Sequence, residues 1–396
     1  MFLAIPTTLR LLIGSLTENS IRFQLRHTHG VSNNSRIIFS DVSPSYSNPE
    51  IFSIKTHSIT THRPPSLSAF ADARTRSMFY GESTSLAWDE VEVQAPNATN
   101  RETLLTLAKM TSNAYSHPSN KDWYDLGPDW NSTFSYGWEP DSDGFRGHVF
   151  VSTDSSTVVT MKKDKLNDNL LFSCCCARVG PTWSTVCGCY EGGNKCDSTC
   201  VENALIEESL FYPVGINLYN NITYMYPNAN IWVIGHSLGG SLASLVGLTF
   251  GAPVIAFEAP AEMLASRRLH LPSPPSTQHI THVFNTADPI PMGVCNGVAS
   301  TCATAGFAME TRCHRGKIMR YDTVGKLGWR VGLQNHPIST VIEYLLMEDW
   351  EKPDEITGAP GRETPELVDE DPDCPAQECI TWTFGDFRNS SANSKL

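Results

Sequence analysis

The chain of 396 residues lacks an excess of positive charge. It carries 29 Lys and Arg residues against 42 Asp and Glu residues, which gives a formal net charge of −13. Nucleic-acid-binding proteins usually present a basic face, so this balance argues against nucleic acid as a partner. Charged residues make up 18% and apolar residues 40% of the sequence. Such a composition excludes wholesale disorder and allows one large domain with insertions, or two small domains.

The sequence also lacks a run of about 20 apolar residues, the length that a transmembrane helix needs. Residues 1–16 come nearest, but this segment is short and is interrupted by Pro6 and Arg10. A signal-peptide core needs only roughly 7 to 15 apolar residues. We therefore interpret residues 1–16 as a weak signal sequence, the remnant of an anchor or a misassigned start.

Cysteine and glycosylation sequons are, by contrast, plentiful. Of the 12 cysteines, seven fall within residues 174–200. They could be buried free thiols or disulfides of an oxidising compartment, and the spacing of Cys196 and Cys200 also suits a zinc site. Five Asn-x-Ser/Thr sequons favour disulfides and the secretory pathway, because such sequons mark surface loops of secreted proteins. The sequons lie at Asn33, Asn97, Asn131, Asn221 and Asn389.

Strands and helices alternate from about residue 100 to about residue 350, which indicates an α/β fold with a mostly parallel sheet and helices on both faces. We divide the chain into an irregular extension (17–94), an α/β domain (95–350) with a cysteine-rich insertion (174–200), and an acidic, Pro-rich, solvated tail (351–396). The extension holds short strands near 36–39 and 51–54. The periodicity predicts helices at 101–115, 203–224 (with a break at Pro213), 238–250 and 338–349, and strands at 147–151, 157–161, 230–234, 254–258 and 279–285.

The segment GHSLG at 235–239 fits the pattern G-x-S-x-G. An apolar strand at 231–234 runs into it and a helix at 241–250 runs out of it. A tight turn between them would hold Ser237 at strained backbone angles and place its hydroxyl at the helix N-terminus, where N–H groups favour negative charge. This context predicts Ser237 as a nucleophile and the Leu238 N–H as an oxyanion donor. The alternative is a Gly-rich turn without chemistry.

A serine nucleophile needs a base and an acid that orients the base, and in this kind of fold both follow it in the chain. Asp288 follows a strand and precedes two prolines, which predicts a rigid loop that holds its carboxylate. Asp322 and Glu258 are its rivals. For the base, His336 lies in the late loop QNHP, and His314, next to a cysteine, is its rival. We expect Ser237, Asp288 and His336 to act together.

The elbow GHSLGGSLASLVG, the acid loop FNTADPIPMGVCNG and the histidine segment NHPISTVIEYLL resemble the class 3 lipase family. The run DNLLFSCCCARVGPTWSTVCGCY resembles its fungal branch of vacuolar phospholipases, and the resemblance covers roughly residues 20–385. It implies an α/β-hydrolase fold, the triad Ser237, Asp288 and His336, and hydrolysis of acyl esters in membrane glycerolipids.

The resemblance also implies a cellular setting. Members of this branch are single-pass type II proteins that travel from the endoplasmic reticulum through multivesicular bodies to the vacuole, where they break down autophagic bodies. They are reported to bind phosphoinositides. The implied partners are therefore membrane phospholipids, and no metal or cofactor is expected.

Two features depart from the family pattern. Members carry an N-terminal apolar anchor, whereas residues 1–16 are short. The strand at 157–161 should end in Lys-Gly-Thr, whose Thr helps to form the oxyanion hole, but the chain continues Lys162-Lys163-Asp164. We expect the oxyanion hole to keep only the Leu238 donor, and one donor contributes a factor of about 10² to 10³ in rate. Both departures together favour a gene model that has lost coding sequence.

Two other functions compete with a glycerolipid hydrolase. One is a carboxylesterase for soluble esters, and the other is a catalytically impaired hydrolase fold that binds lipid. A lid over an apolar trench would favour a lipase, and residues 174–200 could form either such a lid or a structural loop.

Overall fold

The structure is a computed structural model. It describes residues 19–31, 37–41, 52–81, 86–116, 121, 123–124, 146–152, 157–159, 171–175, 187–208, 211–294, 311–353, 360–374 and 378–387. None of the helices within these ranges combines the length and the apolar character that crossing a bilayer requires. The predicted apolar segment 1–16 lies outside the described residues.

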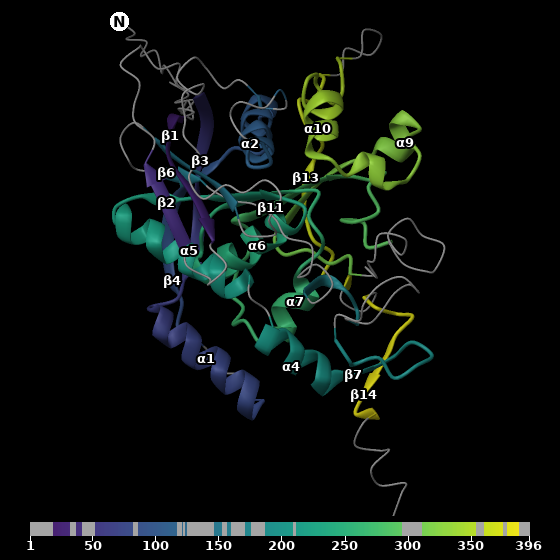
Figure 1. Cartoon of the computed structure of the whole chain (residues 1–396). Coiled ribbons are helices and arrows are strands. Elements are labelled where there is room, and N and C mark those ends of the chain that lie inside the picture. Colours follow the sequence, from purple (N-terminus) through teal and green to yellow (C-terminus); the bar gives the residue numbers. More distant parts are fainter. Residues whose placement is uncertain are drawn as a thin grey trace, which may run out of the picture.

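The strands and helices alternate along the chain as an α/β fold requires (Figure 1). The strands are β1 (Asn19–Val31), β2 (Ile37–Asp41), β3 (Phe52–Arg63), β4 (Asp89–Pro96), β5 (Arg146–Ser152), β6 (Thr157–Val159), β7 (Lys195–Asp197), β8 (Asn230–Ile231), β9 (Val233–His236), β10 (Val254–Phe257), β11 (Ile280–Asn285), β12 (Lys317–Tyr321), β13 (Leu367–Asp369) and β14 (Thr383–Gly385). The helices are α1 (Leu67–Tyr80), α2 (Arg101–Asn113), α4 (Ser198–Glu208), α5 (Phe211–Met225), α6 (Leu238–Phe250), α7 (Met263–Arg268), α9 (Thr323–Leu327) and α10 (Ile338–Thr340), with a 3₁₀ turn η2 (Leu333–Asn335) and a π-helical turn η3 (Val341–Leu345).

Two sheets meet along residues 230–236, where only Trp232 separates β8 from β9. One sheet has the order β4-β3-β1-β5-β6-β8, with β2 paired to β1, and the other has the order β13-β12-β11-β10-β9. The pairings β6–β8, β9–β10, β10–β11 and β11–β12 are all parallel. The predicted α/β-hydrolase class is confirmed. The N-terminal strands add an antiparallel part to the parallel strands that the sequence predicts.

Helices cover both faces of the parallel strands. Figure 1 shows α2 and α10 on one side of the sheet and α5, α6 and α7 on the other. Successive side chains of a strand point to opposite faces, so Val233 packs into the core under α5 and α6 while Ile234 packs into the core under α2 and α10. Burial on both faces explains why these strands read as continuous apolar runs.

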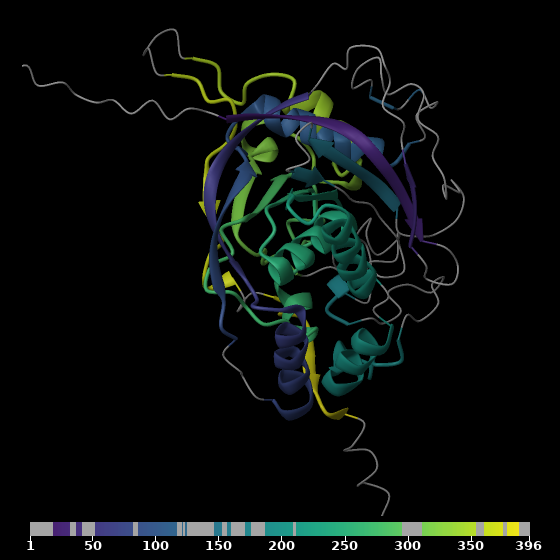
Figure 2. The ribbon, with the colours of Figure 1, turned by 90° about the vertical axis from the view of Figure 1, so that its left-hand side faces the viewer.

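The described residues of 17–94 form strands and a helix, and the expectation of an irregular segment is wrong for them. The short strands expected near 36–39 and 51–54 correspond to β2 and to the start of the longer β3, and β1, α1 and β4 complete the region. Figure 2 shows β1 as a long arc that curves across the molecule. β1 pairs with β3 on one edge and with β5 on the other. β5 comes from a distant part of the chain, so this pairing cannot be read from local periodicity.

The helix predictions differ in accuracy. The helix predicted at 238–250 matches α6, and α2 begins after Asn100, whose side chain accepts a hydrogen bond from the Thr103 N–H as an N-cap. The single helix expected at 203–224 is two helices, α4 and α5. Pro213 lies in the first turn of α5, where a proline costs no hydrogen bond, and so it does not break the helix. The last helix ends at Leu345 instead of 349.

The cysteines form disulfides, as the sequence predicts, and the bond Cys174–Cys379 ties the cysteine-rich block to the C-terminal segment. The described bonds are Cys174–Cys379, Cys175–Cys196, Cys189–Cys200 and Cys313–Cys374. The zinc interpretation of Cys196 and Cys200 is wrong, because both sulfur atoms are consumed in disulfides.

The described residues of 351–396 do not form the solvated tail that the sequence predicts. β13 pairs with β12 at the edge of the sheet, and β14 pairs with β7 of the cysteine-rich block. Cys374 and Cys379 are both buried and disulfide-bonded. This segment is therefore held in place by two strand pairings and two disulfides, although its composition is acidic.

Two of the five sequons lie in described residues. Asn221 is exposed on α5. Asn97 is partly exposed in a turn, where its side-chain oxygen accepts hydrogen bonds from the N–H and the hydroxyl of Thr99. Asn33, Asn131 and Asn389 fall outside the described ranges, and glycosylation at all five positions stays a prediction.

Candidate active site

β9 leads into a strained turn at Ser237, and α6 begins at the next residue. Ser237 has φ 56° and ψ −134°, a conformation that a residue with a side chain rarely adopts. The turn is tight, because a Cβ atom at Gly235 would lie 2.3 Å from the Gly239 carbonyl oxygen. Glycine at position 235 is therefore required by the close approach of the two backbone segments. The strand–turn–helix geometry is the one that the sequence predicts.

The structure brings Ser237, His336 and Asp288 together although 99 residues separate the first two. The Ser237 Oγ lies 2.8 Å from the His336 Nε2. The His336 Nδ1 lies 2.6 Å from the Asp288 Oδ2. Asp288 is fully buried, and its Oδ1 accepts a hydrogen bond from the Ile290 N–H at 3.0 Å. Ser237, His336 and Asp288 thus lie in one hydrogen-bonded chain, which is the arrangement expected of a nucleophile, a base and an acid that orients the base.

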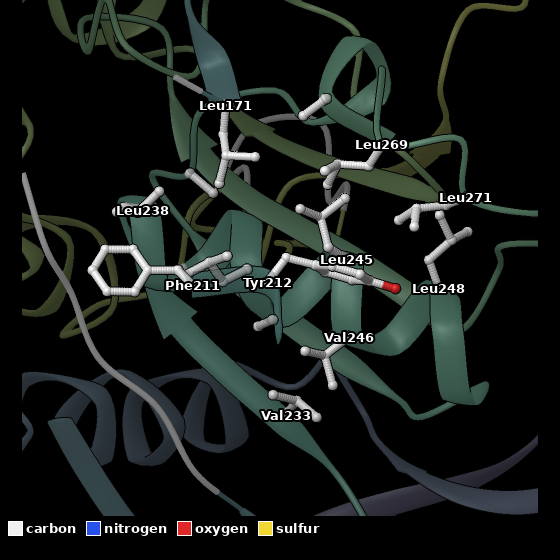
Figure 3. Close-up of a cluster of buried hydrophobic side chains, with 14 of the residues drawn as sticks. Leu171, Phe211, Tyr212, Val233, Leu238, Leu245, Val246, Leu248, Leu269 and Leu271 are labelled. Atoms are coloured by element: carbon white, nitrogen blue, oxygen red, sulfur yellow. The ribbon is translucent and has the colours of Figure 1, made fainter. Parts of the chain in front are cut away.

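Leu238 occupies the first position of α6, where backbone N–H groups have no acceptor within the helix. Its side chain is fully buried and points into the apolar cluster that contains Phe211 and Leu171 (Figure 3). This packing fixes the backbone next to Ser237 and leaves the N–H of Leu238 at the positive end of the helix dipole. The predicted loss of the Gly-Thr donor concerns residues 160–165, which lie outside the described residues.

The rival residues for the acid and the base lie elsewhere. Asp322 caps α9, since its carboxylate accepts a hydrogen bond from the Gly325 N–H at 2.9 Å. His314 is buried beside Glu262, and its Nε2 lies 3.0 Å from the Pro291 carbonyl oxygen. Asp322 is not hydrogen-bonded to His336, and His314 is not hydrogen-bonded to the Ser237 hydroxyl, so His336 and Asp288 are the partners that the geometry favours.

Glu258 has a different position: it lies beside Asp288 at the end of β10. Its backbone φ is 44°, and its carboxyl group is fully buried. The Asn285 backbone N–H and side-chain amide both donate hydrogen bonds to its Oε1, at 3.1 and 2.9 Å. Burial, and then the charge of Asp288, raises the pKa of Glu258 well above its usual value. A neutral Glu258 can donate a hydrogen bond to Asp288 and leave the negative charge on that residue alone.

The loop of His336 is tied to the loop of Asp288 by amide side chains that the sequence did not single out. The Asn285 side chain donates a hydrogen bond to the Asn335 carbonyl oxygen at 3.1 Å. The Asn335 side chain donates in turn to the Ala287 carbonyl oxygen at 3.2 Å. Asn335 directly precedes His336, and Ala287 directly precedes Asp288. The two asparagines therefore set the distance between base and acid.

His236 contacts the His336 segment from the other side. Its Nε2 lies 2.8 Å from the His336 carbonyl oxygen, and its Nδ1 lies 2.8 Å from the Tyr115 hydroxyl. A carbonyl oxygen only accepts hydrogen bonds, so Nε2 carries the proton and Nδ1 accepts from the tyrosine. No local sequence pattern predicts these contacts, because Tyr115 lies far before His236 in the chain and His336 lies far after it.

Ser237 opens into a cleft of about 700 Å³. Ligand sites of small molecules have volumes of roughly 300 to 1,000 Å³. The described residues of the cysteine-rich block 174–200 do not line this cleft, so of the two alternatives for the block, a lid and a structural loop, this part of it fits the structural loop. The lining residues are Ser112, Tyr115, Ser116, Lys121, Trp123, Tyr124, His236, Ser237, His336, Pro337, Ile338, Ser339 and Glu343.

The raised pKa of Glu258 leads to a prediction about stability. A carboxyl group whose pKa is higher in the folded than in the unfolded chain stabilises the fold below its unfolded pKa, near 4.5, and this stability is lost as the pH rises toward the folded pKa. Glu258→Gln keeps the shape and the hydrogen bonds but cannot ionise. Between pH 5 and pH 8 the free energy of unfolding of the wild type should therefore fall relative to this variant, by at most about 1.4 kcal/mol per pH unit.

Urea unfolding at several pH values measures this difference. Glu102→Gln is the matched control, because Glu102 is exposed on α2. Parallel pH dependence of the wild type and Glu258→Gln would contradict the account of a neutral, buried Glu258.

The segment around Ser237 matches a known protein family. A model described as Lipase (class 3) matches residues 212–252, which hold α5, β9, Ser237 and α6. The chain is 53% identical over 294 residues to a protein named Putative lipase ATG15 from Cryptococcus neoformans var. neoformans serotype D, covering 69% of this chain and 56% of that protein. The chain belongs to the class 3 lipase family. A further Putative lipase ATG15, from Mycosarcoma maydis, is 49% identical over 300 residues, covering 69% of this chain and 57% of that protein.

The chain therefore spans a little over half the length of these curated relatives. Solved structures also match, among them Lip2 lipase from Yarrowia lipolytica, with 16% identity, a TM-score of 0.32, and coverage of 55% of this chain and 78% of that one. A triacylglycerol lipase from Penicillium expansum matches with 17% identity, a TM-score of 0.29, and coverage of 58% and 81%.

Proposed function

We propose that this protein is a serine ester hydrolase that cleaves acyl esters of membrane glycerolipids. The observation that carries the proposal is the hydrogen-bonded chain from the Ser237 hydroxyl through His336 to the buried Asp288. A serine hydroxyl is hardly ionised at neutral pH, and an adjacent, oriented base is what turns it into a nucleophile.

In the proposed reaction the Ser237 Oγ attacks the acyl carbonyl carbon while His336 Nε2 takes the hydroxyl proton. Asp288 holds the proton on Nδ1 of His336, so that Nε2 is free to accept, and stabilises the imidazolium that forms. The Leu238 N–H donates to the negative oxygen of the tetrahedral intermediate. His336 then protonates the departing alcohol, and an acyl-enzyme remains on Ser237. Water, activated by His336, releases the fatty acid and restores the serine.

The choice of lipid as substrate is supported by the names of the relatives, which are putative lipases. Aromatic and apolar side chains at the cleft, namely Trp123, Tyr124 and Ile338, suit an acyl chain. The disulfides and the sequons support a setting in the secretory pathway, and the ATG15 relatives support a role in the breakdown of autophagic bodies in the vacuole. An N-terminal type II anchor, passage through multivesicular bodies and phosphoinositide binding stay predictions.

The test is fatty-acid release from phosphatidylcholine vesicles, compared with release from a short-chain ester in solution. A phospholipid hydrolase should act faster on the vesicles, and mass spectrometry after treatment with a fluorophosphonate should find the adduct on the peptide that contains Ser237. Preference for the soluble ester would instead favour a carboxylesterase. Vesicle binding without hydrolysis or labelling would overturn the enzymatic proposal and favour an impaired, lipid-binding hydrolase.

A further inference from the structure

A second cluster of polar side chains lies behind the acid loop and takes no part in the proposed reaction. Glu262 precedes α7, His282 lies on β11, and His314 follows the disulfide-bonded Cys313. All three side chains are at most 1% exposed. Each offers one ligand atom, and these atoms lie within 4.8 Å of one another. Three buried titratable groups from separate parts of the chain thus converge on one point.

The hydrogen bonds of His314 define which of its nitrogen atoms faces the cluster. Its Nε2 lies 3.0 Å from the Pro291 carbonyl oxygen and must carry a proton, since a carbonyl only accepts. In the neutral imidazole, Nδ1 is then a bare acceptor. It faces the Glu262 Oε2, a second acceptor, at 3.7 Å. Among the described residues, neither of these two buried atoms has a hydrogen-bond partner. Two facing acceptors in a buried site repel each other unless a positive charge lies between them.

Hydrogen bonds hold the Glu262 carboxylate in place. The Glu262 Oε1 accepts hydrogen bonds from the Ser244 hydroxyl at 2.6 Å and from the Arg315 N–H at 2.9 Å.

The distances decide between a shared proton and a metal ion. A hydrogen bond to nitrogen spans about 2.7 to 3.2 Å, so 3.7 Å between Nδ1 and Oε2 is too long. Zinc–nitrogen and zinc–oxygen bonds of about 2.0 to 2.2 Å place neighbouring ligand atoms roughly 3.0 to 3.6 Å apart. The Glu262 Oε1 lies 3.2 Å from the His282 Nε2, and the Glu262 Oε2 lies 3.7 Å from the His314 Nδ1, so each histidine faces one oxygen of the carboxylate. The ligand atoms of the three residues lie within 4.8 Å of one another, and a bound ion would draw them closer together. We propose that Glu262, His282 and His314 bind a divalent zinc-type ion.

The surrounding contacts are those that support metal ligands. A ligating histidine commonly donates its other N–H to a backbone carbonyl, as His314 does to Pro291. Ser244 and the Arg315 N–H orient the carboxylate. A second carboxylate, Glu370, accepts a hydrogen bond from the His314 N–H at 2.7 Å and offsets the charge of the ion. Three protein ligands leave the fourth tetrahedral position for a water molecule.

The ion would have a structural role. β11 leads to the loop of Asp288, and Pro291, which His314 contacts, lies three residues beyond that acid. Binding would therefore fix the acid loop to α7 and to the Cys313–Cys374 disulfide. This inference departs from the expectation, drawn from the sequence, that the protein uses no metal. It does not depend on the proposed ester hydrolysis, since no ligand of the ion touches Ser237 or His336.

The experiment uses the full chain, stripped with a chelator and then titrated with ZnCl₂ or CoCl₂. Bound zinc is counted by mass spectrometry after gel filtration, and thermal unfolding is followed in parallel. The wild type should bind about one zinc ion more than Glu262→Gln or His314→Gln. Zinc should raise the Tm of the wild type by several degrees and leave the Tm of these two variants unchanged. His279→Gln is the matched control, because His279 is equally buried but contacts Gly247 instead of the cluster. It should keep the ion, as should Ser237→Ala.

Cobalt supplies a readout on the wild type, in case the cluster variants fail to fold. The Co²⁺-loaded wild type should show the visible absorption of a four-coordinate ion with nitrogen and oxygen ligands, and Zn²⁺ should abolish it. Equal zinc binding by the wild type and a folded cluster variant would overturn the proposal. So would the absence of both bound zinc and the cobalt spectrum.

Discussion

Ser237→Ala should lower kcat for ester hydrolysis by about 10⁵- to 10⁶-fold, because the nucleophile of an oriented serine–histidine–acid chain acts as part of a unit. Without the hydroxyl, no acyl-enzyme can form, and only binding and the Leu238 N–H can still favour the transition state. Rates on a chromogenic ester and fatty-acid release from vesicles measure the loss. The fold should persist, since the change removes one oxygen atom at a turn whose backbone is fixed by its neighbours.

The matched control for this variant is Ser77→Ala. The Ser77 hydroxyl also lies within hydrogen-bond distance of a histidine, at 3.1 Å from the His270 Nδ1, but it belongs to α1. Its removal should leave kcat unchanged. If Ser237→Ala retains more than about a hundredth of the wild-type rate, the covalent mechanism is wrong, since background catalysis would not reach that level.

Asp288→Asn should lower kcat by about 10⁴-fold with little change in the fold. The asparagine amide would donate a hydrogen bond to the His336 Nδ1, which lies 2.6 Å from the present carboxylate oxygen. The proton of His336 would then reside on Nε2, the nitrogen that must accept the proton of Ser237. The loss should fall mainly on kcat rather than KM, because the acid does not contact the substrate in the proposed reaction.

Two further variants decide whether Asp288 or a neighbour is the acid. Asp322→Asn removes a charge at the cap of α9 and should leave kcat unchanged. The double variant Ser237→Ala with Asp288→Asn should be no slower than Ser237→Ala alone, because residues that act as a unit are strongly non-additive. If Asp288→Asn kept the wild-type kcat and Glu258→Gln lost most of it, Glu258 would be the acid instead of Asp288.

The sequence alone identifies much of the candidate site. The elbow is visible because an apolar strand, a small-residue turn and an apolar helix are adjacent in the chain, and α6 has the predicted bounds. The choice of His336 and Asp288 follows from chain order and loop chemistry, and the structure places both beside Ser237. Their catalytic roles stay predictions until the variants are measured.

What supports these residues depends on contacts across the fold. Glu258 lies beside Asp288 because β10 and β11 pair side by side. His236 holds its position through contacts with Tyr115 and with the loop of His336. Both are consequences of burial, which sets protonation and hydrogen bonding and leaves no trace in local spacing.

The sequence by itself determined the elbow, the parallel strands around it and the use of disulfides, because these depend on periodicity, turn chemistry and composition within short stretches. Only the tertiary structure decided that residues 17–94 form strands and that the acidic C-terminal segment is held by Cys374 and Cys379. The same is true of the cluster of Glu262, His282 and His314. The physical reason is that strand partners, disulfide partners and metal ligands are chosen by distance in space, which the fold sets and the spacing along the chain does not.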